Sequence, residues 1–453
     1  MHRFFVFIGL LFCSCLVSSV EAETPVKNVL FLISDDLKAS ALGCYGNEIC
    51  KTPNIDKLAS QGMVFDRAYC QGTSCGPSRR SFMRSRYRDK DNLTLGEHFQ
   101  NNGVYTGRVG KIFHMRVPGD IIAGTNGEDV EACWTERFNT QGREAHTVGD
   151  YSCLNLNIFT RDEENRQSTR MPHRMFVSVE YEGDGSDQPD FQAAKMTVSL
   201  LNQKKAEPFF LATGFVRPHY PSVAPTQYFA PYPFANMPLP EMPEGDLDDI
   251  PKAGIPGLTN ASSGIGKYPE NIQRMWSAYY ATVTYMDEQV GKVLDELDRL
   301  GLRESTVVVF TSDHGYHLGE HTFWQKSNLH EESTRVPLII SAPGFEAGRS
   351  GSLAELVDIY PTLCELTGKP IPKAVEGSSL VSILKDPSEK VNETAVSFVQ
   401  KGKGWRFDDW AYMRYKDGSE ELYDMKADPG QFTNLAEKED SGEVLERMRK
   451  LKP

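Results

Sequence analysis

The sequence predicts an α/β protein built on a doubly wound, mostly parallel sheet flanked by helices, with a smaller C-terminal α+β subdomain. Two observations carry this expectation. Short, continuously apolar runs alternate with amphipathic helical stretches, which is typical of parallel strands buried on both faces. Near the end of the chain, short segments separated by turn signals replace that pattern. With 453 residues and 40% hydrophobic content, the chain is long enough for one large domain and an appendage.

The first residues have the pattern of a secretory signal. His2 and Arg3 precede an apolar run over residues 4–20, and Val20-Glu21-Ala22 is a suitable cleavage site. The apolar run is short and interrupted by serines, which argues against a stable membrane anchor. We therefore expect residues 1–22 to be removed and the mature protein to be secreted or periplasmic.

Three apolar runs are predicted as parallel strands, and each of them ends in polar residues. Residues 26–34 lead into Asp35-Asp36, residues 306–312 into Asp313-His314-Gly315, and residues 208–215 into Arg217-Pro218-His219. The carboxyl ends of parallel strands meet at one edge of a sheet, where ligands bind in such folds. We therefore expect these polar groups to lie together.

The remaining segments of the sequence indicate a core helix, a long surface segment and the boundary between two domains. Residues 280–300 carry apolar side chains at helical spacing and are predicted as a core helix. Residues 221–269, rich in Pro, Gly and acidic residues, are predicted as a long irregular segment, a surface excursion from the domain, that borders the entrance to the binding site. A hairpin is expected around Asp417-Gly418. The predicted domains are residues 23–372 and 373–453.

Charge and cysteine content narrow the class of protein. The net charge of −13 and pI near 5.4 argue against a nucleic-acid or membrane-surface binder, so any anion site must be local. Of nine cysteines, Cys13 and Cys15 leave with the signal and seven remain, an odd number that leaves at least one thiol unpaired or chemically special. Cys133 and Cys153 are the pair we would most readily bridge, although the sequence does not determine the connectivity.

The most specific stretch is Cys75-Gly76-Pro77-Ser78-Arg79. It resembles the Cys-x-Pro-Ser-Arg signature that formylglycine-generating enzymes recognise in sulfatases. Other stretches resemble sulfatase motifs in family order: Asp35-Asp36, Thr52-Pro53-Asn54-Ile55-Asp56, Gly110-Lys111-Ile112-Phe113-His114, Arg217-Pro218-His219, Asp313-His314-Gly315, Leu318-Gly319-Glu320-His321 and Leu422-Tyr423-Asp424. The Gly-Lys-x-Phe-His stretch makes the chain most similar to iduronate-2-sulfatase-like enzymes of the alkaline-phosphatase-like superfamily. For Cys75 alone, a disulfide partner or packed thiol is the alternative.

The resemblance implies hydrolysis of sulfate esters on sulfated saccharides. The resemblance also implies that the nucleophile of the reaction is formylglycine, made from Cys75 by a formylglycine-generating maturation enzyme. A sulfate ester is negatively charged, so the nucleophile must be strong, fixed in place and accompanied by positive charge. The family pattern gives the metal ligands as Asp35, Asp36, Asp313, His314 and the formylglycine oxygen at position 75. Hard oxygen donors suit Ca²⁺ or Mg²⁺, and an exported location favours Ca²⁺.

The resemblance also assigns roles to the basic side chains. Lys111 and Lys326 contact sulfate oxygens, and Arg79 holds the nucleophile and the carboxylates. His114 is the expected base and His219 the expected acid for the leaving alcohol. A structural role is the alternative for each. Because this metal set is already complete, we expect His317 and His321 to support the ligands or to pack near them. Tyr316 lies beside the metal motif in the sequence and could contact the substrate.

The chain departs from the family pattern after Ser81. The usual Thr-Gly is absent, and residues 84–91 form a shorter segment than expected. A run of basic residues that begins before this segment could bind a polyanionic sugar or form a solvated face: Arg79, Arg80, Arg84, Arg86, Arg88 and Lys90. Two other functions stay open, namely a phosphatase, phosphodiesterase or phosphonate hydrolase of the same superfamily, and a catalytically silent binder of sulfated glycans.

Overall fold

The computed structural model describes residues 26–88, 92–164, 166 and 170–451. The predicted signal, residues 1–22, lies outside the described residues. Within those residues, no helix is both long and apolar enough to cross a membrane.

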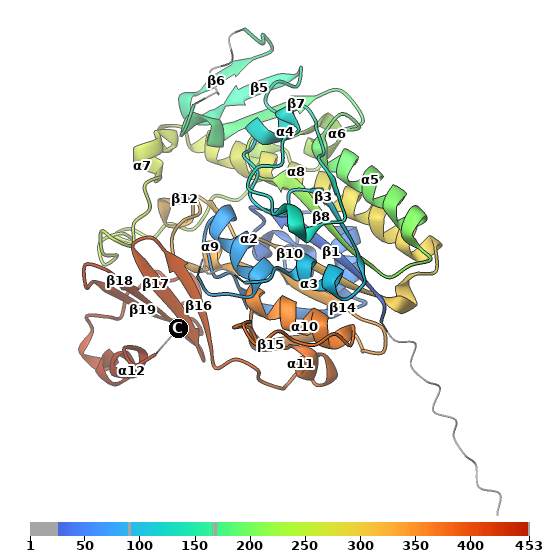
Figure 1. The fold of residues 1–453 in the computed structure, drawn as a ribbon. Helices are drawn as coiled ribbons and strands as arrows, with labels where there is room; N and C mark the ends of the chain where they lie inside the picture. The colour runs from blue at the N-terminus through green and yellow to red at the C-terminus, as the bar shows by residue number, and fades with distance from the viewer. Residues whose placement is uncertain (1–25, 89–91, 165, 167–169, 452–453) are drawn as a thin grey trace, which may run out of the picture.

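A nine-stranded mixed sheet forms the centre of the molecule (Figure 1). Its strand order is β13-β2-β14-β10-β1-β8-β3-β4, with β15 beside β2. The five strands from β10 to β4 are mutually parallel, whereas β14 is antiparallel to both β10 and β2. The strands are β1 (Asn28–Asp35), β2 (Met63–Tyr69), β3 (Tyr105–Gly110), β4 (Glu136–Phe138), β8 (Phe209–Pro218), β10 (Thr306–Ser312), β13 (Arg335–Val336), β14 (Leu338–Ser341) and β15 (Gly348–Glu355).

Strand β1 shows why this sheet has helices on both faces. All eight of its residues are buried. Leu30 and Leu32 belong to one large hydrophobic cluster, and Phe31 and Ile33 belong to the other. Successive side chains of a strand point to opposite faces, so a continuously apolar strand requires two covered faces. The predicted doubly wound architecture is confirmed.

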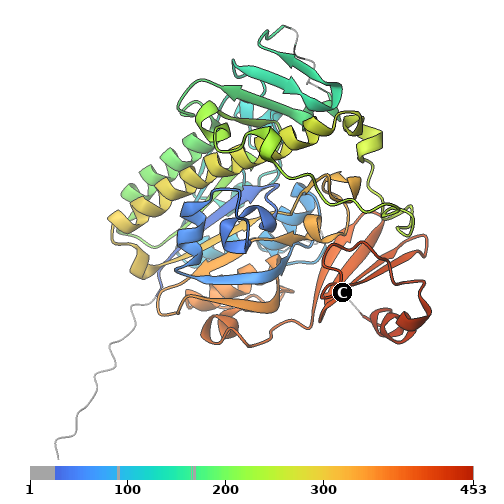
Figure 2. The ribbon, with the colours of Figure 1, turned by 180° about the vertical axis from the view of Figure 1, so that it is seen from behind.

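Helices fill both layers. The long helix α8 (Pro269–Arg299) and α5 (Pro189–Lys204) lie side by side across one face (Figure 2). The predicted core helix over 280–300 is the second half of α8. The same cluster includes residues of α1 (Pro53–Ala59). Four shorter helices contribute to the cluster on the opposite face: α2 (Cys75–Arg84), α3 (Leu95–Asn101), α10 (Ile359–Leu366) and α11 (Val381–Lys385).

The C-terminal subdomain is a four-stranded antiparallel sheet with helix α12 (Gly442–Met448) beside it. The strands are β16 (Thr394–Val399), β17 (Gly402–Phe407), β18 (Trp410–Tyr415) and β19 (Glu420–Asp424). Strands β18 and β19 form the predicted hairpin. Helix α11 lies beyond residue 372 but packs into the core of the large sheet. The domain boundary at residues 372 and 373 stays a prediction.

A second four-stranded sheet, which was not predicted, lies at the top of Figure 1. It consists of β5 (Asp150–Cys153), β6 (Ile158–Thr160), β7 (Val177–Tyr181) and β9 (Ser222–Pro225). The excursion expected over 221–269 thus begins with a strand. The remaining α-helices and strands are four short helices and a two-stranded ribbon: α4 (Gly119–Ala123), α6 (Thr226–Phe229), α7 (Asn260–Ser263), α9 (Glu331–Thr334), and β11 (His317–Leu318) paired with β12 (Trp324–Gln325).

The predicted Cys133–Cys153 bridge is wrong. All seven cysteines of the described chain are free. Cys133 packs in the cluster beneath α2 and α3, with its Sγ 2.7 Å from Thr94 Oγ1. Cys153 packs in the separate cluster of the small sheet, with its Sγ 3.5 Å from Asn155 Oδ1. The two thiols therefore act as small apolar side chains in different cores.

Candidate active site

The carboxyl ends of four neighbouring parallel strands deliver the polar groups of the site. Strand β1 ends at Asp35, and β10 is followed directly by Asp313 and His314. Lys111 follows β3 and His219 follows β8. Helix α2 then brings its first residue, Cys75, to the same edge. This is the convergence that the three strand-end motifs predicted.

Four side chains form a compact, buried group of donors. The ligand atoms of Asp35, Asp36, Cys75 and His314 all lie within 4.8 Å of one another. Cys75 Sγ is 3.4 Å from His314 Nε2 and 4.0 Å from Asp36 Oδ1. Asp36 Oδ2 is buried and has no hydrogen-bond partner among the described residues. Carboxylate oxygens gathered out of water, one of them unpaired, fit a divalent cation.

Asp313, the fifth predicted ligand, lies next to this group. Its Oδ2 accepts a hydrogen bond from Arg79 Nε at 2.8 Å and lies 3.5 Å from His314 Nε2. Its Oδ1 accepts from the backbone N–H groups of Asp36 and His314 at 3.2 and 3.1 Å. These contacts hold the turns after β1 and β10 together, so Asp313 positions two of the predicted metal ligands, Asp36 and His314.

Arg79 links the helix to the strand ends. Its side chain is fully buried. Besides Asp313, it donates to Asp35 Oδ1 at 3.2 Å and to the carbonyl oxygen of Ile112 at 3.0 Å. Residues 75 and 79 share one face of α2, because side chains four positions apart are neighbours on a helix. The spacing within the Cys-x-Pro-Ser-Arg stretch therefore places thiol and guanidinium at the same site.

Two lysines supply further positive charge inside the site. Lys111 Nζ bonds Asp35 Oδ2, and Lys326 Nζ bonds Asp36 Oδ1 and lies 3.2 Å from Cys75 Sγ. Lys326 comes from the loop after β12, which the Ser327 N–H joins to the Thr73 carbonyl oxygen at 2.9 Å. The site thus holds three cationic side chains around three carboxylates.

Burial and these cations set the charges of the acidic groups. Burial disfavours the charge of Asp35, but the positive charges of Lys111, Arg79 and Lys326 outweigh it and hold the pKa of Asp35 well below the usual value. For Asp36, burial prevails and raises the pKa despite Lys326. Burial, with the nearby Asp35 charge, also raises the pKa of the Cys75 thiol. An unmodified Cys75 is therefore a protonated thiol and a weak nucleophile.

The two predicted acid–base histidines flank the cluster. His219 Nδ1 lies 2.6 Å from the Tyr220 carbonyl oxygen, and its Nε2 lies 3.8 Å from Asp36 Oδ2. Burial holds the pKa of His219 well below the usual value. Burial and Lys111 lower the pKa of half-buried His114, whose Nδ1 has no hydrogen-bond partner within the described chain. Both imidazoles are neutral in this state, so His219 must gain a proton before it can act as an acid.

Three residues that the sequence did not single out support the site. Tyr279, on α8, donates its O–H to the Asp36 carbonyl oxygen at 2.7 Å. The ring centres of Tyr220 and His219 lie 4.1 Å apart, and Lys326 Nζ lies 5.8 Å from the centre of the Tyr220 ring. Glu144 accepts from Arg217 Nη2 at 2.9 Å. Of these three, only Tyr220 could have been found from the sequence, because it directly follows His219 of a strand-end motif.

The other predicted neighbours pack around the site. Tyr316 is buried and stacks on Tyr279 at 5.6 Å. His317 Nε2 is 3.1 Å from Asn328 Oδ1, and His321 Nδ1 is 3.0 Å from Asp246 Oδ2. Neither histidine belongs to the donor group, which agrees with the packing roles expected for them.

A mixed α/β sheet with this strand-end site defines a member of the alkaline-phosphatase-like superfamily. The profile of the Sulfatase family matches residues 27–369, and that of the N-sulphoglucosamine sulphohydrolase C-terminal domain matches residues 319–452. The chain therefore belongs to the sulfatase family. It is a sulfuric ester hydrolase, as the resemblance predicted.

Individual relatives agree with this assignment. A sulfatase of Formosa agariphila is 29% identical over 100% of this chain and 92% of its own length. Iduronate 2-sulfatase of Homo sapiens is 33% identical over 80% of this chain and 72% of its own length.

Solved structures share the fold at lower identity. One, in complex with its substrate D-glucosamine-2-N,6-O-disulfate, has a TM-score of 0.71 at 21% identity and covers 94% of this chain and 97% of its own. The phosphonate monoester hydrolase from Silicibacter pomeroyi has a TM-score of 0.76 at 21% identity, covering 93% and 94%.

Proposed function

We propose that this protein is an exported sulfatase that removes sulfate from sulfated saccharides, with formylglycine at position 75 as nucleophile and a divalent cation at the strand ends. The observation that carries the proposal is the position of Cys75. It is the first residue of α2, within hydrogen-bond range of His314 and Lys326 and beside Asp36. As an unmodified thiol it would be protonated, whereas its sequence context is that of a maturation site.

A modified residue 75 and a divalent cation would supply the central chemistry. Formylglycine at position 75, made by a maturation enzyme, would supply a hydrated aldehyde whose hydroxyl is the nucleophile toward sulfur. Ca²⁺, with Mg²⁺ as the alternative, increases the acidity of that hydrate and neutralises sulfate oxygens when bound. Asp35, Asp36 and His314 would hold the ion together with position 75, and Asp313 would complete the set.

The chain's own residues bind, orient and move protons. Lys111 and Lys326 offer point charges to the sulfate oxygens. Arg79 holds Asp35 and Asp313 in place. His219 Nε2 gives a proton to the leaving alcohol once the anionic substrate has raised its pKa, and His114 accepts one.

Saccharide substrates are supported by the relatives. Iduronate 2-sulfatase and an N-acetylglucosamine-6-O-sulfatase of Bacteroides thetaiotaomicron are named for sugar sulfates, and one structural neighbour holds a glucosamine disulfate. Secretion or a periplasmic location follows from the signal proposed for residues 1–22.

The missing Thr-Gly does not disturb the nucleophile. Helix α2 ends at Arg84, and Ser85 takes a left-handed conformation there with φ of 50°. The buried Ser85 hydroxyl bonds the Val357 carbonyl oxygen at 2.7 Å and accepts from the Gly377 N–H at 3.1 Å. The first two turns of α2 keep the contacts that Cys75 and Arg79 make with the strand-end residues. This favours an active enzyme over a catalytically silent glycan binder.

A phosphonate or phosphate ester hydrolase is the second candidate, because phosphonate monoester hydrolases share the fold. The two candidates are separated by rates on sulfate and phosphate esters of the same alcohol. We expect the sulfate to be cleaved far faster, since one cation site and three basic side chains suit a monoanionic ester. A preference for phosphate would place the protein with the phosphoesterases.

A further inference from the structure

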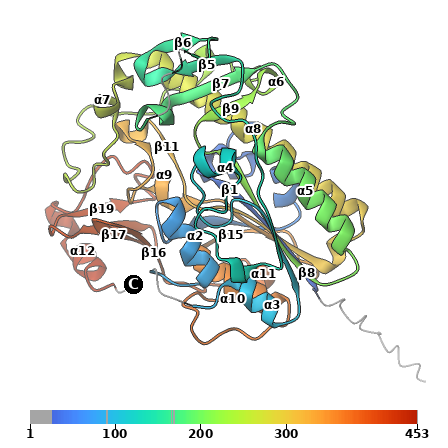
Figure 3. The ribbon, with the colours of Figure 1, turned by 45° about the horizontal axis from the view of Figure 1, so that its top comes forward.

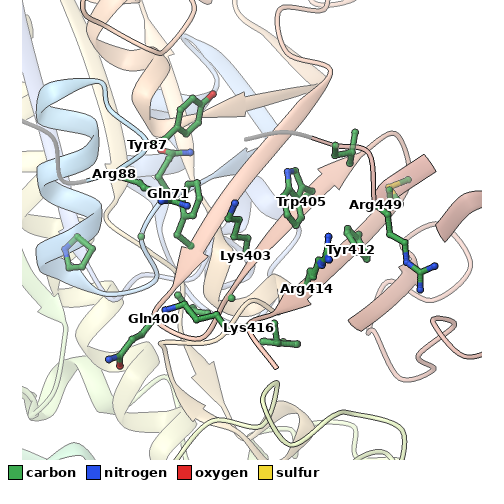
Figure 4. A pocket seen from close by; sticks show the side chains of 18 residues that line it. Gln71, Tyr87, Arg88, Gln400, Lys403, Trp405, Tyr412, Arg414, Lys416 and Arg449 are labelled. Carbon is green, nitrogen blue, oxygen red and sulfur yellow. The ribbon is translucent and has the colours of Figure 1, made fainter. Parts of the chain in front are cut away.

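A cavity of about 590 Å³ lies between the C-terminal sheet and the loop that follows α2 (Figure 4). We call it the distal cavity. Its walls come from the segment before α2, from β16 to β18 and from the end of α12. The residues that the argument uses are Arg88, Phe398, Lys403, Trp405, Tyr412 and Arg414.

Strand register gathers these side chains on one face of the sheet. Lys403 pairs with Arg414, and Trp405 pairs with Tyr412, across β17 and β18. Phe398 of β16 pairs with Lys403. Directly paired residues of neighbouring strands share a face, so two rows form side by side: Phe398, Lys403 and Arg414 in one, and Trp405 and Tyr412 in the other. Alternate residues, including Ala411 and Met413, pack on the opposite face in a cluster with Leu329.

Most of the cationic groups have no acidic partner: only Arg414 lies opposite a carboxylate, Glu420 of β19, and no ion pair joins the two within the described residues. Within the described chain, Arg88, Lys403, Arg414 and Lys416 form no ion pair, and no Asp or Glu is among the residues that line the cavity. Arg449 differs, because it bonds Glu420 at 2.6 Å. Partial burial first, and then repulsion by Arg88 and Arg414, lower the pKa of Lys403. Lys403 and Arg414 are like charges directly opposite each other on the sheet, which is destabilising, so an anion bound in the cavity would stabilise this arrangement.

Aromatic rings provide the second feature. Trp405 and Tyr412 stack with ring centres 5.5 Å apart. Lys403 Nζ lies 5.9 Å from the Trp405 ring centre, and the Arg88 guanidinium lies 5.3 Å from that of Phe398. Trp405 and Tyr412 are buried against α12, so the partly exposed Phe398 is the aromatic surface that the cavity offers. An apolar surface edged by cations matches a sugar ring that carries sulfate or carboxylate groups, since the ring's C–H face can pack while its anions pair.

The distal cavity continues toward the nucleophile. A second cavity, of about 510 Å³, shares Pro77, Phe398 and Gln400 with it. This second cavity is also lined by Ser74 and Ser327, the neighbours of Cys75 and Lys326 in the chain. A saccharide chain could therefore run from the reacting ester along both cavities.

We propose that the distal cavity binds an anionic sugar unit of the same saccharide chain whose sulfate ester is cleaved, several units away from that ester. This inference rests on the proposed function. It makes the preferred substrate an oligosaccharide or polysaccharide, and it gives Arg88 of the shortened basic segment a binding role. A protein of net charge −13 would thus concentrate its local positive charge along the substrate path.

Binding to the full-length Cys75→Ala protein tests the cavity without turnover. Isothermal titration calorimetry compares a heparin-derived sulfated hexasaccharide, a disaccharide from the same polymer and neutral maltohexaose. We expect the hexasaccharide to bind most tightly. When Lys403→Gln and Arg414→Gln are added to the Cys75→Ala protein, its affinity for the hexasaccharide should fall by about tenfold, and its affinity for the disaccharide should fall much less. Adding Lys195→Gln and Lys205→Gln, two exposed positions on and just after α5, removes the same charge on the other side of the molecule (Figure 3) and should change neither.

Several outcomes would overturn the inference: equal affinity for hexasaccharide and disaccharide, an unchanged hexasaccharide affinity in the double variant, or equal binding of maltohexaose. Arg88→Gln, on a loop outside the sheet, provides the test if the double variant does not fold. Sulfate release from the disaccharide by matured wild-type enzyme is measured separately. Its absence would contradict the proposed function, while the binding ratios would still decide the role of the cavity.

Discussion

The contact between His219 Nδ1 and the Tyr220 carbonyl oxygen determines which nitrogen can serve the reaction. At 2.6 Å, Nδ1 must be the donor, so Nε2 faces the site. In the role proposed for His219, the proton that Nε2 would deliver matters most when the leaving group is a poor one, as a sugar alkoxide is.

We therefore predict that His219→Ala slows the cleavage of a sugar sulfate by about 10²- to 10⁴-fold and that of an aryl sulfate much less. A phenolate can leave without protonation. Steady-state rates on both substrates, with wild-type enzyme matured in parallel as control, measure the difference. Equal losses on the two substrates would mean that His219 is not the general acid.

At the scale of single residues, the sequence predicted the groups that stand in short motifs at strand ends, including Asp35, Asp313 and Lys111. It missed Glu144 and Tyr279, which reach the site or its supporting residues from an irregular segment and from the middle of a helix. No local pattern indicates such contacts, because they depend on how distant segments pack. Asp313 shows a further limit: its motif predicts a ligand but not that its oxygens would bond Arg79 and backbone N–H groups.

At the scale of elements, Glu355 joins four segments at the end of β15. Its Oε1 accepts from Gln71 Nε2 at 3.2 Å and from the Val396 N–H at 2.7 Å, and its Oε2 accepts from the Tyr87 O–H at 2.6 Å. The carboxyl thereby connects β15 with both ends of the α2 region and with β16. Burial, followed by the nearby Asp358 charge, raises the pKa of Glu355 to about 8.

A raised carboxyl pKa in the folded state stabilises the protein at low pH. That contribution is complete below the ordinary pKa of about 4.3 and is lost as pH rises through about 8. We predict that wild-type protein exceeds Glu355→Gln in unfolding free energy at pH 5, and that the gap narrows by on the order of 1 kcal/mol or more by pH 8. Denaturant unfolding at several pH values measures it, with exposed Glu393→Gln as control. A gap independent of pH would contradict the burial argument.

Long apolar strands and the amphipathic α8 were predictable because their periodicity spans many residues. The small sheet of β5, β6, β7 and β9 was not, since its strands contain only three to five residues. The pairing of β14 with β10 is likewise set by tertiary contacts rather than by a local pattern. The C-terminal hairpin was recognisable from Asp417-Gly418, where the turn itself requires a glycine with φ of 91°.

At the scale of the whole molecule, the buried donor group joins the ends of β1 and β10 to the start of α2. Asp35 and Asp36 are adjacent carboxylates buried away from water, so a bound cation would relieve their repulsion and stabilise the folded state. The large-scale architecture followed from the sequence because buried strands with polar ends allow few arrangements. The disulfide prediction failed because cysteine spacing says nothing about which core each thiol enters.

We predict that chelation followed by desalting abolishes sulfate release and lowers the melting temperature, and that added Ca²⁺ restores both. The melting temperature of Asp36→Asn should respond little to Ca²⁺, because one ligand oxygen is replaced by an amide. Elemental analysis of the chelated protein is the control. Full activity in protein shown to be free of metal would refute the cation site.

The central claim is that position 75 carries an aldehyde rather than a thiol. Mass spectrometry of the intact peptide spanning residue 75, from enzyme produced in a host with the maturation enzyme, tests it most directly. The account predicts the mass of formylglycine at that position, in a fraction of the protein that matches the sulfatase activity of each preparation. Fully active enzyme whose Cys75 is an unmodified thiol, or is bound in a disulfide, would contradict it.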